Sequence, residues 1–282
     1  MRAGYNRVVS RSQRLERVRA LVVRARPLGE RDRLVRLFAE RRGSFAARAT
    51  SAMELKSRLA PRLMPLHLGT FSLVSTRGGL PIIAGAEIAF RFAHWRRSGR
   101  RIVLASLFLA TLDELQAPPE ANAQFWQLVL NLLRTDPPER ALPSLLALFL
   151  HRCLELLGLN GDARCSLCDR VLAPPQYSAR SRTFALASAD LSTFFCRRCF
   201  NRKYGGQQVE VVKVGVSDLA LLRRLRRCPL LDFARLSLRP RQVAFIVGLF
   251  RQRAQDMLPG TVDLLASVAA PMGIPDQELP PL

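Results

Sequence analysis

The sequence predicts a multidomain α+β protein, in which a β-barrel precedes an all-α helical domain that carries an inserted four-cysteine segment. Three observations support this prediction. Short β-branched segments separated by turns fill the first 90 residues, helical spacing of apolar residues dominates afterwards, and two Cys-x-x-Cys pairs interrupt the helical part. Hydrophobic residues make up 49% of the 282-residue chain, which is enough to build packed cores.

Five segments in the N-terminal part have the β-branched content and the turn-bounded spacing of strands. They cover residues 18–25, 34–39, 44–50, 67–76 and 82–89. The first strand is expected to be broken at Pro27-Leu28-Gly29, and a polar segment around Lys56 has room for a short helix. Five strands with such an insertion between the third and fourth predict an OB-fold barrel over residues 17–89. An SH3-like barrel has nearly the same periodicity.

After about residue 90, apolar residues recur at three- and four-residue steps, which is typical of helices. The predicted helices cover residues 101–115, 124–133, 142–157, 217–227 and 240–257, with Ser217 as the cap of the fourth. The first three are apolar around most of their circumference, which indicates a buried bundle. The expected domains are a basic arm at 1–16, the barrel, helical parts at 90–162 and 207–270, an insert at 163–206, and a flexible tail at 271–282.

Four of the six cysteines form two pairs, Cys165-x-x-Cys168 and Cys196-x-x-Cys199. The two-residue spacing lets both sulfurs of a pair reach one tetrahedral zinc ion, and a hairpin over residues 177–195 would span the gap between the pairs. Four thiolates fill the coordination sphere, so the sequence predicts one structural Zn²⁺ per chain and no catalytic water. Disulfides are the alternative. The two remaining cysteines, Cys153 and Cys228, are expected to be small core residues.

The formal charge of +22 is unevenly distributed along the chain. Residues 1–85 contain 18 Lys+Arg against 5 Asp+Glu, a balance of +13, whereas residues 86–160 contain 8 against 7. This concentration of positive charge predicts a nucleic-acid-binding face, with an anionic membrane surface or an acidic protein as alternatives. No run reaches about 18 uninterrupted apolar residues, so no membrane span is expected. The basic first residues lack the apolar core of a secretory signal.

Basic residues in and next to the predicted barrel are the predicted DNA contacts. They are Arg24, Arg26, Arg31, Arg33, Arg41, Arg42, Arg48, Lys56, Arg58, Arg62, Arg96 and Arg97. The last two belong to a segment, residues 91–101, in which arginines alternate with Phe92 and Trp95. Such interleaving suits a surface that stacks bases and binds phosphates. Packing of both rings at a domain junction explains the pattern equally well.

Residues that could support catalysis are scarce. The three histidines, His67, His94 and His151, lack metal-ligand spacing, and there is no Gly-rich phosphate loop. The acidic residues of the basic part do not cluster as a two-metal nuclease requires. We therefore expect a protein that is not an enzyme. The alternatives are a zinc-containing DNA-repair enzyme, such as a glycosylase, and an RNA-binding or ribosome-associated protein.

Several short motifs follow one another in a recognisable order. They are Val22-Val23-Arg24, the run from Pro27 to Val35, Leu37-Phe38, Gly43, Lys56-Ser57-Arg58, Leu80-Pro81, and Leu156-Leu157-Gly158-Leu159 ahead of Cys165. From about residue 17 to the end, this order resembles the RecO family of bacterial recombination mediators. The chain departs from the family pattern at residues 50–54, where Glu54 places an acid in a normally basic stretch.

The resemblance implies a function and a set of partners. A member of this family would bind single- and double-stranded DNA and anneal complementary strands. It would act with a RecR-like partner to displace single-strand-binding protein, whose acidic tail it would hold, and would thereby help to load a RecA-like recombinase. The expected location is the bacterial cytoplasm, in association with the nucleoid.

Overall fold

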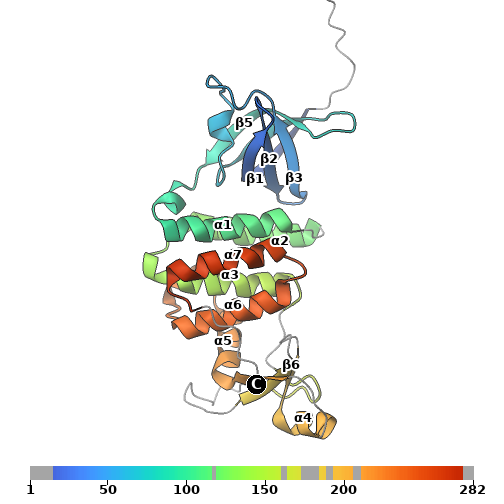
Figure 1. Ribbon diagram of the computed structural model, residues 1–282, viewed down its shortest axis with the longest axis vertical. Helices are drawn as coiled ribbons and strands as arrows, with labels where there is room; N and C mark the ends of the chain where they lie inside the picture. The colour runs from blue at the N-terminus through green and yellow to red at the C-terminus, as the bar shows by residue number, and fades with distance from the viewer. Residues whose placement is uncertain are drawn as a thin grey trace, which may run out of the picture. The chain divides into compact units, whose positions relative to one another are not determined.

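The structure is a computed structural model that describes residues 15–115, 119–159, 164–172, 184–188, 193–205 and 211–275 (Figure 1). The chain forms two compact units. Unit 1 comprises Met1–Ala93 and Gln116–Ala123, and unit 2 comprises His94–Leu115 and Gln124–Leu282. The predicted basic arm lies outside the described residues up to residue 14. Within the described part of the chain, no helix is long and apolar enough to cross a membrane.

Unit 1 contains the predicted five-stranded barrel. Its strands are β1 (Leu15–Leu28), β2 (Asp32–Ala39), β3 (Gly43–Ala49), β4 (Leu68–Val74) and β5 (Ile82–Phe90). They close in the order β1-β2-β3-β5-β4, which confirms the prediction of an OB-like barrel (Figure 1). β1 is long because it pairs with β4 through its first half and with β2 through its second half. The barrel closes where β3 and β5 run parallel, with Arg48 opposite Ile82.

Two local predictions in the barrel were wrong. Pro27 does not break β1: it pairs with Arg33 near the strand's end, where a residue without an N–H is tolerated. The short helix between β3 and β4 is a single 3₁₀ turn, η1 (Ala60–Arg62), which lies after Lys56 rather than around it. Proline at position 61 suits the first turn of such a helix because its missing N–H would have no intrahelical partner there.

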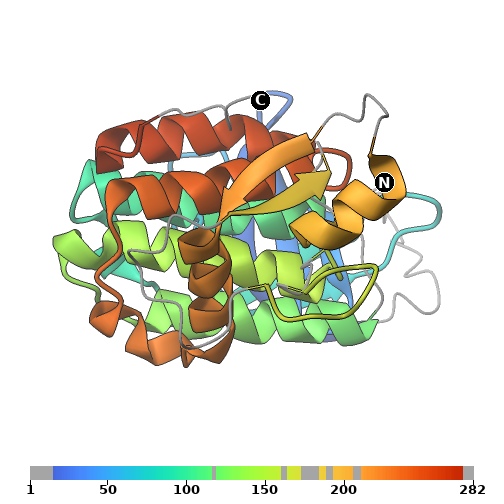
Figure 2. The same cartoon turned by 90° about the horizontal axis from the view of Figure 1, so that it is seen from below.

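Unit 2 is a helical bundle built around the apolar helix α3. The helices are α1 (Gly99–Glu114), α2 (Pro119–Arg134, from residue 124 on), α3 (Leu142–Leu156), α5 (Val216–Arg227), α6 (Pro240–Ala254) and α7 (Pro259–Ala269). α3 packs against α1, α5 and α6, while α7 lies against α1 and α6 (Figures 1 and 2). Short 3₁₀ turns lie between two pairs of helices, η3 (Glu139–Ala141) before α3 and η4 (Leu230–Arg235) before α6. Two more flank the bundle, η2 (Ala93–Arg96) before α1 and η5 (Ala270–Met272) after α7.

Three details of unit 2 differ from the prediction. Ser217 does not cap α5, because the helix already begins at Val216 and Gly215 occupies the cap position. Helix α7 was not predicted at all. The tail was expected to begin at residue 271, but Met272 and Ile274 are buried, so the chain still packs there. Residues 276–282 lie outside the described part.

The cysteine-containing insert adds a small sheet and one helix to unit 2. β6 (Phe184–Ser188) pairs with both β7 (Phe194–Phe195) and β8 (Val211–Gly215), and α4 (Arg197–Tyr204) follows β7. The antiparallel pairing of β6 with β7 confirms the predicted hairpin between the cysteine pairs. Residues 177–183 of that prediction lie outside the described residues.

Candidate nucleic-acid interface and metal centre

Arginines gather on the outer face of β1, β2 and β3. The strand register places Arg24 directly opposite Arg36, and it places Arg26, Leu34 and Arg48 in one row across the three strands. The intervening row, Ala25, Val35 and Ala47, belongs to the barrel core. Side chains at directly opposite positions have Cβ atoms about 4.5–5.5 Å apart. Arg24, Arg26, Arg36 and Arg48 therefore form one compact patch, called the β1–β3 face below.

A β-bulge in β1 gives two of these arginines their outward direction. Val22 points into the core, and simple alternation along a strand would send residues 24 and 26 to the same side. The register with β2 shifts between Val22 and Arg24, so Val23 is an extra residue at this point. Beyond the bulge, Arg24 and Arg26 are exposed, and Ala25 packs against the core.

Arg36 is the member of the face that was not among the predicted DNA contacts. It lies on β2 between Val35 and Leu37, both fully buried in the core. The apolar–basic–apolar alternation is the signal that could have identified it as an outward residue.

Arg48 is held in place by an acidic neighbour. Its Nε lies 2.6 Å from a carboxylate oxygen of Asp32, whose other oxygen accepts the backbone N–H of Ser51 at 2.8 Å. These two hydrogen bonds, from Ser51 and then from Arg48, lower the pKa of Asp32 below its ordinary value of 3.8. The Arg48 side chain remains about half exposed (51%), whereas that of Asp32 is 12% exposed. Arg48 thus faces solvent in a fixed orientation with part of its charge balanced.

The segment after β3 is tied to the turn between β1 and β2. Glu54 accepts a hydrogen bond from Nε of Arg31 at 2.9 Å, and the backbone N–H of Met53 donates to the carbonyl of Arg31 at the same distance. Nε of Arg33 lies 3.1 Å from Sδ of Met53. The hydrogen bond from Arg31 lowers the pKa of Glu54. Glu54 therefore binds a neighbouring arginine and fastens the segment that presents Lys56.

The other predicted contacts in unit 1 have varied surroundings. Lys56 and Arg58 are exposed on the segment before η1. Arg41 and Arg42 occupy the β2–β3 turn, where the Arg42 guanidinium lies over the ring of Phe45, 4.0 Å from its centroid. Arg62 donates a hydrogen bond of 2.8 Å to the carbonyl of Ala86.

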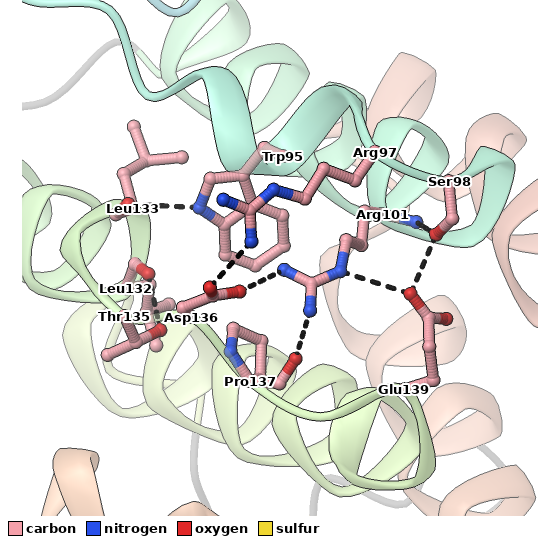
Figure 3. Close-up of polar contacts among 10 residues, drawn as sticks. All are labelled: Trp95, Arg97, Ser98, Arg101, Leu132, Leu133, Thr135, Asp136, Pro137 and Glu139. Carbon is pink, nitrogen blue, oxygen red and sulfur yellow. Dashed lines mark hydrogen bonds and ion pairs between the residues drawn. The ribbon is translucent and has the colours of Figure 1, made fainter.

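The aromatic residues near the start of unit 2 do not form a stacking surface. Trp95 is fully buried and donates its Nε1–H to the carbonyl of Leu133 at 2.9 Å (Figure 3). Its ring packs edge-on against Phe108. Phe92, in unit 1, is also buried. Interpreting these two rings as a base-stacking platform was therefore wrong, because a buried ring has no face for a base. Arg96 is exposed.

Arg97 and Arg101 share a network with two acids (Figure 3). Arg97 contacts Asp136 at 2.9 Å, and Arg101 contacts the second oxygen of Asp136 at 2.6 Å. The Arg101 side chain is only 9% exposed, and its Nε also donates to Glu139 at 3.0 Å. The network joins the start of α1 to the residues between α2 and α3. The network therefore stabilises the packing of these two segments against each other, and it is called the brace below.

The two cysteine pairs come together in the insert. Sγ atoms of Cys165, Cys168, Cys196 and Cys199 all lie within 4.8 Å of one another, and this group is called the cysteine cluster. The first pair lies in a tight turn closed by a hydrogen bond from the N–H of Cys165 to the carbonyl of Arg170, 2.9 Å. The second pair occupies the N-terminus of α4, with Cys196 as its cap.

The donor set fits a tetrahedral metal ion. The distance between Sγ of Cys168 and Sγ of Cys196 is 3.9 Å. Metal–sulfur bonds of about 2.3 Å in tetrahedral geometry place the sulfurs about 3.8 Å apart. Burial opposes ionisation of the Cys165 thiol, but backbone N–H groups of Cys196, Leu167 and Cys168 outweigh it and lower the pKa to about 6. Interaction with the neighbouring cysteine side chains instead raises the pKa of Cys199 to about 12.

The remaining cysteines lie apart from the cluster. Cys153 is fully buried in α3, as predicted, and burial raises the pKa of its thiol. Cys228 is only partly buried, at the end of α5, so its placement in the core was wrong.

Comparison with protein families agrees with this architecture. The family model described as "Recombination protein O N terminal" matches residues 14–92, and the one described as "Recombination protein O C terminal" matches residues 96–251. The chain belongs to the RecO family. The DNA repair protein RecO of Heliobacterium modesticaldum is 28% identical over 242 residues, which are 85% of this chain and 84% of that protein. The protein of the same name from Pelotomaculum thermopropionicum is 27% identical over 223 residues, 77% and 79% of the two chains.

Membership identifies the chain as a DNA repair and recombination protein of a family of non-enzymatic mediators. The resemblance seen in the sequence is thereby confirmed, and so is the prediction that the protein is not an enzyme. In particular, the glycosylase-like alternative is set aside. Four clustered cysteines that could hold a metal complete the agreement with the predicted fold.

Proposed function

We propose that the protein binds single- and double-stranded DNA through the β1–β3 face and anneals complementary strands. The observation that carries this proposal is the position of Arg24 directly opposite Arg36. Like charges at directly opposite positions of a sheet repel each other and destabilise it. A phosphate between them would interact favourably with both guanidinium groups, so the arrangement suits a bound polyanion.

Annealing by this face would require no covalent step. Each guanidinium that neutralises a phosphate releases condensed counterions, and the loss of charge lets two strands approach each other. The neighbouring predicted contacts would extend the path of the backbone. They are Arg31, Arg33, Arg41, Arg42, Lys56, Arg58 and Arg62, all on unit 1. Arg96 and Arg97, on unit 2, are proposed DNA contacts of that unit.

We also propose that the cysteine cluster holds one structural Zn²⁺. Soft thiolates are the ligands that zinc prefers, and the sulfur spacing suits its tetrahedral geometry. The ion would join the turn at Cys165 to the N-terminus of α4, and four sulfurs would leave it no open position. Its contribution would therefore be to folding of the insert.

The proposed partners follow from the family. A RecR-like protein would act together with the chain, the acidic tail of single-strand-binding protein would dock on it, and a RecA-like recombinase would be loaded as a result. The proposed location is the bacterial cytoplasm, with the nucleoid.

The decisive experiment is annealing of complementary oligonucleotides coated with single-strand-binding protein. We expect duplex formation that depends on the protein, needs no ATP and yields no cleavage product. Gel shifts with DNA and RNA of matched sequence should be run in parallel. Failure to anneal would contradict the mediator role, and a clear preference for RNA would favour an RNA-binding function instead.

A further inference from the structure

The helix that follows the second cysteine pair carries a second concentration of positive charge. We propose that the exposed face of α4, formed by Arg197, Arg198 and Arg202, is a nucleic-acid-binding surface additional to the β1–β3 face. It would bind the phosphate backbone of a second DNA strand. Only the ligand class, DNA, rests on the function proposed above; the surface itself is argued from the residues of the insert.

The three arginines lie along one side of the helix. Arg198 and Arg202 are one turn apart, about 6 Å along the axis, and Arg197 adjoins them at the start of the helix. All three are exposed, while Cys199 is buried toward the cysteine cluster. The main packing of α4 is on β6, within the insert (Figures 1 and 2). The arginine side of the helix therefore faces solvent.

No acidic side chain among the described residues balances the charges on this face. Among the described residues of the insert, Asp169 is the only acidic residue, and its carboxylate pairs with Arg164 at 2.8 Å. Arg197, Arg198 and Arg202 make no hydrogen bond or ion pair with a described residue. On the β1–β3 face, by contrast, Asp32 offsets part of the charge of Arg48. The guanidinium groups of α4 thus remain available for an external anion.

The position of two of these arginines, Arg197 and Arg198, is unfavourable without such an anion, whereas Arg202 lies in the last turn of the helix. Arg197 and Arg198 occupy the first turn of α4, where the helix dipole is positive and disfavours cations. An anion at this end is favoured by the dipole and by the bidentate geometry of two guanidinium forks. Negative thiolates of the cysteine cluster reduce the unfavourable interaction between these arginines and the helix dipole. The alternative role of the arginines is therefore to neutralise the negative charge of the thiolates. The experiment below separates the two roles by measuring metal content.

Two aromatic rings that lie beside Arg197 and Lys203 and pack on Phe195 favour nucleic acid over an acidic peptide. Phe200 and Tyr204 lie on the same short helix with ring centroids 5.2 Å apart, and both are partly exposed. Nζ of Lys203 lies 5.2 Å from the centroid of the Tyr204 ring. Partly exposed rings next to cations are the combination on which single-stranded nucleic acids stack while their phosphates are held. A second such surface on one chain would let it hold two strands at once, which annealing requires.

The test compares two full-length, metal-loaded variants with the wild type. One is Arg197→Ala/Arg198→Ala/Arg202→Ala. The control, Arg134→Ala/Arg224→Ala/Arg227→Ala, removes the same number of exposed arginines from α2 and α5. Two measurements are made: the salt dependence of binding to a fluorescein-labelled oligothymidylate, and capture of a second labelled oligothymidylate by protein bound to an immobilised one.

We expect the α4 variant to lose most of the capture of the second strand. Its salt slope should fall by about 2, since each phosphate neutralised on a single strand contributes about 0.7. Zinc content and Tm should match the wild type, and the control should behave as wild type throughout. The proposal would be overturned if the α4 variant captured the second strand as well as the wild type does, or if the control lost as much capture. It would also be overturned if the α4 variant lost its zinc together with its DNA binding. So would stronger competition by an acidic peptide than by oligothymidylate.

The outcome also separates this proposal from the function proposed above. If the wild type binds no DNA, both are wrong. If the wild type binds and anneals DNA while the α4 variant is indistinguishable from it, only the second surface is wrong.

Discussion

Asp32 and Arg48, on neighbouring strands of the barrel, form an ion pair in which Nε of Arg48 lies 2.6 Å from the Asp32 carboxylate. The same carboxylate accepts the N–H of Ser51 and so holds the start of the segment that carries Lys56 and Arg58. Asp32 is therefore an acid on a basic face whose effect is to orient one cation and to anchor the segment that presents two more.

The first prediction concerns Asp32 and pH. Its pKa is lowered in the folded protein, so the carboxylate contributes stability above its ordinary value of 3.8, and that stability is lost as the pH falls through the lower folded value. Asp32→Asn should lower the Tm of the barrel at neutral pH. The difference from wild type should shrink below about pH 4. Thermal melts between neutral and acid pH measure this.

Glu30→Gln is the matched control, because Glu30 is exposed in the adjacent turn and has no described partner. A Tm for Asp32→Asn equal to that of wild type at neutral pH would show that the ion pair contributes no stability.

The second prediction concerns the DNA interface. Replacing Arg24, Arg26, Lys56 and Arg58 together by alanine should weaken DNA binding whatever the base sequence. The salt slope on single strands should fall by about 0.7 for each phosphate that is no longer neutralised. Fluorescence anisotropy over a range of NaCl concentrations measures both effects. An unchanged salt slope would indicate that the DNA-binding site lies outside unit 1.

A single substitution on this face provides a sharper test. Arg24→Thr removes the repulsion with Arg36 and places a residue of high β-propensity on the strand. We expect weaker DNA binding together with a Tm equal to or above that of wild type. A lower Tm would indicate that Arg24 is a structural residue.

The third prediction concerns the metal centre. Cys196→Ser should lower zinc content because a site with three thiolates is open and weaker. The insert should become more susceptible to proteolysis, while the helical content of the bundle is retained. Zinc affinity of the wild type should rise with pH, since protons compete for the thiolates. Elemental analysis and limited proteolysis are the measurements, and Cys153→Ser, in the buried core, is the control that should keep its zinc.

The fourth prediction concerns the brace at the start of unit 2. Arg101→Ala removes a nearly buried guanidinium that donates hydrogen bonds to Asp136, Glu139 and the carbonyl of Pro137. Because both carboxylates are about half exposed, solvent reduces the cost, and we expect a loss of about 2 kcal/mol in unfolding free energy. Denaturant unfolding measures it. The neighbour Arg100 is unsuitable as a control because it is itself partly buried, whereas exposed Arg134→Ala should have little effect.

Much of the architecture was predictable from local patterns. Alternation and turns identified five strands, and three- and four-residue spacing identified five of the six bundle helices. The two Cys-x-x-Cys pairs identified the members of the cysteine cluster. These signals are covalent spacings or short periodicities, which the chain carries wherever it folds. The concentration of arginines in the first 85 residues is likewise a property of the sequence alone.

Tertiary structure decided what local patterns do not encode. Helix α7 was missed because Pro259-Gly260 resembles a turn. Its N-terminus is capped by a residue distant in the sequence, because Glu114 accepts hydrogen bonds from the N–H and the hydroxyl of Thr261, both at 2.7 Å. The outward direction of Arg24 depends on the bulge at Val23, and the burial of Trp95 depends on a carbonyl 38 residues away. Each of these features is a long-range contact, whose energy exists only once distant segments have come together.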